Sequence, residues 1–205
     1  MKKIVIKSLM NYISKRGNYT DIQLAEIEYG LTGIYLTFSK IIIISILACI
    51  LGIFKEMIIF MILFNLIRTS GFGLHATKSW ICLISSTIIF IGIPWVCNNI
   101  VINIYLKGII SIISVLLIYK NAPADTKKRP IVNRKRRKIL KLISTLTSII
   151  FITISMLINN NFISNCLMFA IILEDFLISP FVYRIFNLPY NNYVEFLKSH
   201  PNFNS

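Results

Sequence analysis

Acidic residues are scarce in this chain. It holds 8 Asp and Glu against 22 Lys and Arg, which gives a formal net charge of +14. Such an excess is found in nucleic-acid-binding proteins, but the positive-inside rule also produces it in membrane proteins. Because 56% of the 205 residues are hydrophobic and the mean hydropathy is +0.72, we favour the membrane explanation and expect no nucleic-acid partner.

Cysteine is also sparse, and its spacing argues against two classes of small protein. No two cysteines form a Cys-x-x-Cys pair, and the four are Cys49, Cys82, Cys97 and Cys166. This pattern indicates neither a disulfide framework nor a zinc site, and we expect no metal and no cofactor. Three of the four lie in or at the ends of apolar runs, which is typical of small side chains buried in a membrane protein.

No extended polar region is present that would form a second, soluble domain. Apolar residues instead gather in runs of roughly 20, the length that a helix needs to cross a bilayer core of about 30 Å. The sequence therefore predicts a single all-α integral membrane domain over 1–205, in the cell membrane, with about six transmembrane helices. The expected spans are 34–54, 57–67, 80–96, 101–119, 139–158 and 162–183.

The first 30 residues contain no apolar stretch long enough to cross a membrane. Apolar residues recur there at spacings of three and four among five Lys and Arg, which predicts a basic amphipathic helix on the cytoplasmic membrane surface. We do not expect a cleaved signal peptide, because Lys7 and Asn11 interrupt the apolar stretch and no small-residue cleavage site follows.

The densest basic segment is 120–138, which holds nine Lys and Arg. The positive-inside rule assigns this loop and the basic N-terminus to the cytoplasm, so an even number of crossings must separate them. Residues 57–67 are short for a span, but counting them gives four crossings. Both termini, the tail 184–205 and residues 68–79 then lie on the cytoplasmic side, where thiols stay reduced.

A histidine and a cysteine lie in a polar, glycine-bearing segment between two apolar runs. His75 precedes Cys82 by seven residues, whereas the second histidine, His200, lies in the polar tail. The thiolate is the nucleophilic form of cysteine, and a histidine can take the thiol proton near pH 7. By itself the spacing is a weak pattern, because an inert buried thiol and an interfacial histidine would give the same one.

The spacing also constrains the backbone. Residues seven apart on a continuous helix are separated by about 10.5 Å along its axis, too far for a thiol–imidazole hydrogen bond of roughly 2.6–3.2 Å. A catalytic pair therefore requires a bend, which Gly71 and Gly73 permit. Thr77 and Ser79 are suitable caps for a following helix. Cys82 would then lie in the first turn of that helix, where backbone amides stabilise an anion.

A block at 119–131 opens the basic loop. Pro123 and Pro130 restrict its backbone. Its charge serves either membrane topology alone or the docking of an acidic peptide segment or lipid head groups.

Two acidic residues, Glu174 and Asp175, lie inside the last expected span. Ionisable groups at that depth are energetically expensive and usually face a cavity or a partner. One of them would orient His75 or pair with a lysine; the alternative is a structural ion pair.

Three blocks of residues together give the chain a family resemblance. They are 66–68, Gly73, 75–76, Trp80 and Cys82 in the first block, 122–131 in the second, and 171–174 followed by Pro180 in the third. With the length, the six-span layout and the basic N-terminus, these blocks resemble the AgrB family of membrane-embedded cysteine endopeptidases. The family often carries adjacent glycines before the histidine, whereas Phe72 separates the two glycines here.

The resemblance implies an activity. It makes His75 and Cys82 the catalytic pair, acting on the cytoplasmic side, and an AgrD-like propeptide the substrate. It implies that Cys82 cleaves an acidic C-terminal tail from this quorum-sensing peptide and keeps the remainder as an acyl-enzyme thioester. The peptide's own Cys or Ser would then close a cyclic thiolactone or lactone. The resemblance also implies a homodimer.

Candidate substrate-binding residues are Arg68, Lys127, Lys128, Arg129 and Glu174. A different class of function also fits the composition: a non-enzymatic membrane transporter or assembly factor for a small peptide, in which the histidine and cysteine are structural. Cys82→Ala separates the two, because only the enzyme requires that thiol for tail cleavage.

Overall fold

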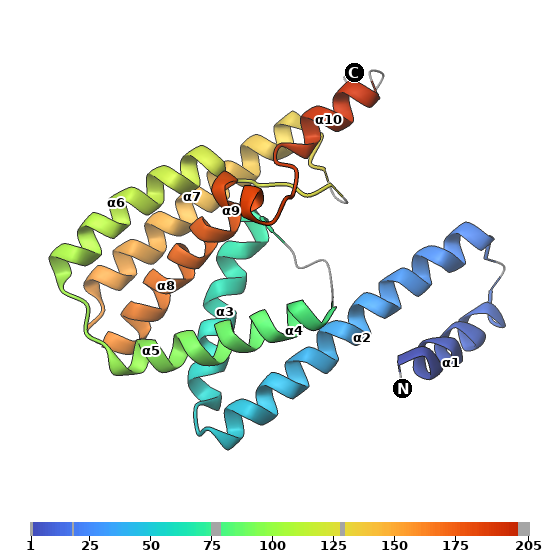
Figure 1. Ribbon diagram of the computed structural model, residues 1–205, viewed down its shortest axis with the longest axis horizontal. Helices are drawn as coiled ribbons and strands as arrows, with labels where there is room; N and C mark the ends of the chain where they lie inside the picture. Colours follow the sequence, from blue (N-terminus) through green and yellow to red (C-terminus); the bar gives the residue numbers. More distant parts are fainter. Residues whose placement is uncertain (1, 18, 75–78, 128–129, 201–205) are drawn as a thin grey trace. The chain divides into compact units, whose positions relative to one another are not determined.

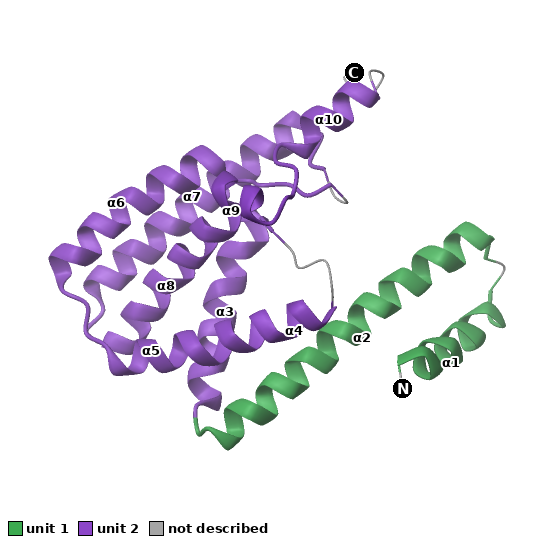
Figure 2. Ribbon diagram, viewed as in Figure 1, with its two compact units in different colours: residues 1–52 green, residues 53–205 purple. Residues whose placement is uncertain are grey.

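The computed structural model describes residues 2–17, 19–74, 79–127 and 130–200. Every regular element within these ranges is a helix, and an isolated parallel bridge joins Phe72 to Ala124. The all-α fold class predicted from the sequence is confirmed. Figure 1 shows the helices in chain order, and they divide into two compact units, Met1–Gly52 and Ile53–Ser205 (Figure 2).

The first unit consists of two helices, α1 (Lys2–Ser14) and α2 (Asp21–Ile50), which pack on each other. Thr20 begins α2 with a capping box: its side chain accepts from the Gln23 amide, and the Gln23 side chain accepts from the Thr20 amide. Because α2 then runs without a break, residues 21–30 belong to the same helix as the first expected span. The amphipathic segment proper ends at Ser14.

The second unit is a bundle around α8 (Asn161–Ile178), which contacts α3 (Phe54–Gly71), α6 (Ile104–Asn121) and α7 (Arg134–Leu157). In Figure 1, α6, α7 and α8 run side by side. In its most apolar stretch α8 has 56% of its residues buried, against at most 22% for the other apolar helices of spanning length. The core of this unit includes a cluster of three aromatic rings, Phe60, Phe64 and Phe90.

The segment 79–99 is one long helical run made of three pieces. It consists of α4 (Ser79–Thr87), a π-helical turn η1 (Ile88–Gly92) and α5 (Ile93–Asn99). Pro94 lies at the start of α5 and has no amide hydrogen to donate to the preceding turn. A single π turn within an α-helix is a known local irregularity, and the helical run continues through Pro94 to Asn99.

Five helical runs in the described residues are long and apolar enough to cross a membrane: 21–50, 79–99, 104–121, 134–157 and 161–178. Residues 57–67 lie within α3, which has 18 residues but also carries Lys55, Glu56 and Arg68. Its crossing, on which the six-span topology depends, stays a prediction. Two short helices, α9 (Pro180–Ile185) and α10 (Asn192–Ser199), follow α8.

Candidate functional site

The end of α3 turns sharply just before the expected catalytic segment. Phe72 and Gly73 both have positive φ, 61° and 86°, a combination that reverses the chain within two residues. The bend predicted at Gly71 and Gly73 is present, and Phe72 takes part in it although such a φ is uncommon for a bulky side chain.

The two glycines that flank Phe72 lie close to α8. A Cβ on Gly71 would overlap the Glu174 Oε1 atom, and a Cβ on Gly73 would lie 2.6 Å from the carbonyl oxygen of Leu177. Real Cβ atoms do not come this near to other heavy atoms. The glycines therefore serve two purposes, backbone conformation at Gly73 and close packing at both positions.

Three backbone hydrogen bonds hold this turn. The Gly73 amide donates to the Ala124 carbonyl at 2.8 Å, and the Ala124 amide donates to the Gly71 carbonyl at 3.0 Å. The Leu74 amide donates to the Leu177 carbonyl at 3.0 Å. The three sequence blocks of the resemblance, around Gly73, Ala124 and Glu174, therefore meet at one place.

An ion pair reinforces the same junction from the side chains. The Arg68 Nη1 atom lies 3.4 Å from the Glu174 Oε2 atom, and the Arg68 Nη2 atom donates to the Leu74 carbonyl. Both side chains are largely buried. Of the roles considered for Glu174, the structure places it in an ion pair, with an arginine rather than a lysine. Substrate binding by Arg68 and Glu174 stays a prediction.

Asp125 is the residue that sequence reasoning missed. It is almost fully buried, and its carboxylate accepts from the backbone amides of Asn192 at 3.1 Å and Tyr193 at 2.9 Å. The amide of Ile131 donates to it at 3.3 Å, and Arg137 forms an ion pair with it at 3.4 Å. One carboxylate thus joins the basic loop to α7 and α10. The only signal in the sequence was a lone acid within a basic, proline-bracketed block.

The connections around Asp125 are further tied by tyrosines. The Tyr183 hydroxyl donates to the Asp125 carbonyl at 3.2 Å, and the Tyr190 hydroxyl donates to the Asn121 carbonyl at 3.3 Å. Burial raises the pKa of Tyr190, an effect that Arg137 opposes, so the hydroxyl remains a donor at neutral pH. The Ala122–Pro123 peptide bond at the start of this loop is cis.

Cys82 is the fourth residue of α4 and therefore lies in its first turn, as expected from the sequence. Its side chain is half-buried, whereas the neighbouring Trp80 is exposed. His75 and Thr77 lie outside the described residues. The pairing of His75 with Cys82 therefore stays a prediction. Leu74 and Ser79 are the described residues on either side of that segment.

Of the basic residues predicted to bind substrate, Lys127 is exposed. Lys128 and Arg129 lie outside the described residues. Among the described residues, no group of three or more His, Cys, Asp or Glu side chains is arranged to hold a metal ion.

Comparison with known proteins gives consistent similarities. Residues 6–178 match the family model described as Accessory gene regulator B. A putative AgrB-like protein of Clostridium acetobutylicum is 29% identical over 199 residues, covering 95% of each chain. Accessory gene regulator protein B of Staphylococcus aureus strain Newman is 34% identical over 177 residues, covering 85% of this chain and 92% of the relative.

A third relative, accessory gene regulator protein B of Staphylococcus intermedius, is 28% identical over 175 residues, covering 85% and 92% of the two chains. No solved structure matches this chain.

Proposed function

This chain belongs to the accessory gene regulator B family of multi-pass membrane proteins that take part in quorum-sensing peptide processing, and we propose that it is the cysteine endopeptidase of that process. The proposed substrate is an AgrD-like propeptide with an amphipathic leader, a Cys or Ser in its middle segment and an acidic C-terminal tail. The proposed reaction is removal of the tail coupled to ring closure.

In the first step His75 takes the proton of the Cys82 thiol, and the thiolate attacks the carbonyl carbon that joins the middle segment to the tail. The peptide C–N bond breaks, the proton passes from His75 to the departing amine, and the tail leaves. A thioester between Cys82 and the rest of the peptide remains. The position of Cys82 in the first turn of α4 supports this step, because backbone amides at a helix N-terminus stabilise an oxyanion.

In the second step the propeptide's own Cys or Ser attacks the thioester carbonyl. The new S–C or O–C bond closes the ring as the bond to Cys82 breaks, and the Cys82 thiol is regenerated. Exchange of one thioester for another is nearly balanced in energy, so water must be kept away from the acyl-enzyme. The half-buried position of Cys82 in an apolar helix suits this requirement.

The observation that carries the proposal is the anchoring of the chain next to His75. The turn that ends at Leu74 is fixed by hydrogen bonds to Ala124 and Leu177 and by Arg68. Catalytic groups need rigid support, because a misplacement of about 1 Å can cost a hundredfold in rate. Four hydrogen bonds around one short loop hold the residue that precedes His75.

The basic loop is the proposed docking surface for the acidic tail. Lys127 is exposed, and Lys128 and Arg129 follow it directly, so three positive charges are adjacent in sequence. The active site would lie on the cytoplasmic side of the cell membrane, as the positive-inside rule expects. A homodimer is proposed on the family resemblance alone.

The test is tail cleavage of a co-expressed propeptide with Cys82→Ala and His75→Ala. Both variants should accumulate in the membrane at wild-type level and give no cleaved tail. Cys49→Ala is the matched control, because it removes an exposed thiol from the first unit and should leave cleavage unchanged. Cleavage that persists in Cys82→Ala would favour the transporter or assembly-factor hypothesis instead.

A further inference from the structure

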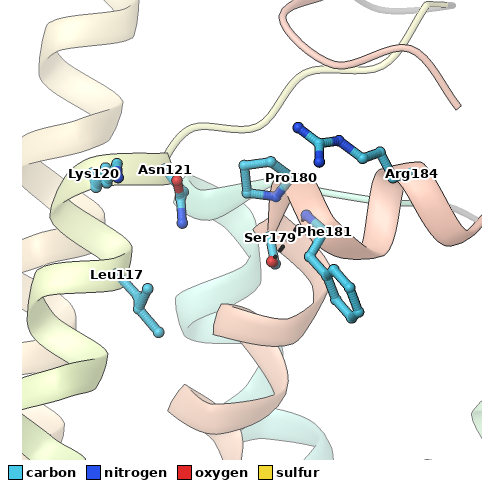
Figure 3. A pocket seen from close by; sticks show the side chains of 7 residues that line it. All are labelled: Leu117, Lys120, Asn121, Ser179, Pro180, Phe181 and Arg184. Carbon is cyan, nitrogen blue, oxygen red and sulfur yellow. Dashed lines mark hydrogen bonds between the residues drawn. The ribbon is translucent and has the colours of Figure 1, made fainter.

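A pocket of about 330 Å³ lies where α6 ends and α9 begins, and its wall includes Leu117, Lys120, Asn121, Phe181 and Arg184. Figure 3 shows these side chains from close by. Two of the lining residues are cationic and none is acidic. The charge of the lining therefore favours an anion.

The two cations are not part of the ion pairs described above, which join Arg68 to Glu174 and Arg137 to Asp125. Lys120 and Arg184 are both exposed and both line the pocket, so an anion that enters it can reach either cation. An arginine suits an oxyanion because its guanidinium presents a planar pair of donors, and a lysine adds a compact point charge.

The apolar residues of the pocket point to a second property of its ligand. Leu117 is 40% exposed and Phe181 is 67% exposed. In Figure 3 both lie below Pro180, whereas Arg184 reaches back over Pro180. The ligand thus meets cations at one side and hydrocarbon at the other.

The position of the pocket at the ends of the apolar helices also fits a ligand with an anionic part and an apolar part. The apolar helices α6 and α8 end at Asn121 and Ile178, so the pocket lies at the boundary between hydrocarbon and water. The basic loop begins at the same level, which by the positive-inside rule is the cytoplasmic leaflet. At that depth an anion attached to hydrocarbon is the head group of a membrane lipid.

We infer that this pocket binds the phosphodiester head group of an anionic phospholipid from the cytoplasmic leaflet, with Lys120 and Arg184 on the phosphate and with Leu117 and Phe181 beside the acyl chains. A zwitterionic lipid fits less well, because its ammonium group would approach the same two cations. Basic residues near an anionic membrane surface each strengthen binding severalfold, so the pair should give roughly 30-fold tighter binding.

The experiment uses the purified full-length protein in neutral detergent, with phosphatidylglycerol or phosphatidylcholine added as the probe. Bound lipid is counted by native mass spectrometry, and the thermal unfolding midpoint is measured in parallel. Wild-type protein should retain phosphatidylglycerol and unfold at a higher temperature with it than with phosphatidylcholine. The double variant Lys120→Gln/Arg184→Gln should lose about 30-fold in affinity and lose the difference between the lipids.

A matched control is Lys135→Gln/Arg136→Gln, which removes the same charge from two exposed residues of α7 outside the pocket. It should bind phosphatidylglycerol as the wild type does. An equal loss in both double variants would overturn the inference, because binding would then follow net charge and not the pocket. Unchanged lipid preference in the pocket variant would overturn it as well.

Two competitors identify the ligand. Inorganic phosphate or a short acidic peptide that displaces phosphatidylglycerol at similar concentration would overturn the assignment to a lipid. Displacement by inorganic phosphate would reassign the pocket to free phosphate, and displacement by the peptide would reassign it to a peptide tail. The inference does not rest on the proposed peptidase activity, and the Cys82→Ala variant should bind the lipid as the wild type does.

Discussion

The backbone amide of Gly73 donates to the carbonyl of Ala124 at 2.8 Å. This hydrogen bond connects the turn before His75 to the start of the basic loop. If the turn positions the proposed catalytic histidine and the loop receives the acidic tail, then the two functions share one rigid junction. Changes that weaken the junction should therefore affect stability and cleavage together.

Replacement of Gly73 by alanine should destabilise the protein by at least about 2 kcal/mol. The residue has a φ of 86°, and its new Cβ would lie 2.6 Å from a backbone carbonyl of α8, which cannot move aside as a side chain can. We expect a lower unfolding midpoint in detergent and a loss of tail cleavage in membranes.

The matched control for that variant is Gly108→Ala. Gly108 lies inside α6, and a Cβ there would meet nothing within 4 Å. Alanine should stabilise this helix by roughly 0.5–1 kcal/mol. An unfolding midpoint that falls equally in both variants would show that the turn geometry at Gly73 is not the cause.

The sequence predicted the local backbone features of this junction, but not which distant residues pair across it. Apolar runs indicated the helices because burial in lipid requires length and continuity. Two glycines indicated a bend because only glycine adopts such backbone freely. The pairing of Arg68 with Glu174 across 106 residues had no periodic pattern behind it. Asp125 was similarly hidden, since its partners lie in three later segments of the chain.

Loss of either partner of the Arg68–Glu174 pair should be strongly destabilising, by about 3–5 kcal/mol, because the remaining charge is left buried and unpaired. The variants are Arg68→Met and Glu174→Gln, compared by thermal unfolding. The double variant should be less destabilised than the sum of the two, because neither charge remains. Strict additivity would mean that the two side chains do not interact in the folded protein.

Asp125→Asn should destabilise the loop by roughly 2–3 kcal/mol. The amide keeps one acceptor oxygen, but its NH₂ group would take the place of the other and face the backbone donor of either Asn192 or Tyr193, and Arg137 would lose its charged partner. Limited proteolysis should show faster cutting in the basic loop or near α10. Glu195→Gln, an exposed acid of α10, is the control and should leave the proteolysis pattern unchanged.

Reversal of the charges at 127–129, by Lys127→Glu, Lys128→Glu and Arg129→Glu together, should reduce cleavage of an acidic-tailed propeptide by at least tenfold. Attraction between charges in water is screened by salt, so the wild-type rate should fall as ionic strength rises, and the rate of the variant should rise slightly. The measurement is the initial rate of tail release in membrane vesicles at several salt concentrations.

A propeptide whose tail acids are replaced by glutamine should be cleaved slowly by the wild type. The charge-reversed variant should cleave this glutamine-tailed propeptide at nearly the same slow rate, because the tail carries no acids for the loop to attract or repel. Equal rates for the acidic-tailed peptide in both proteins would remove this loop from substrate recognition and leave its charge to membrane topology.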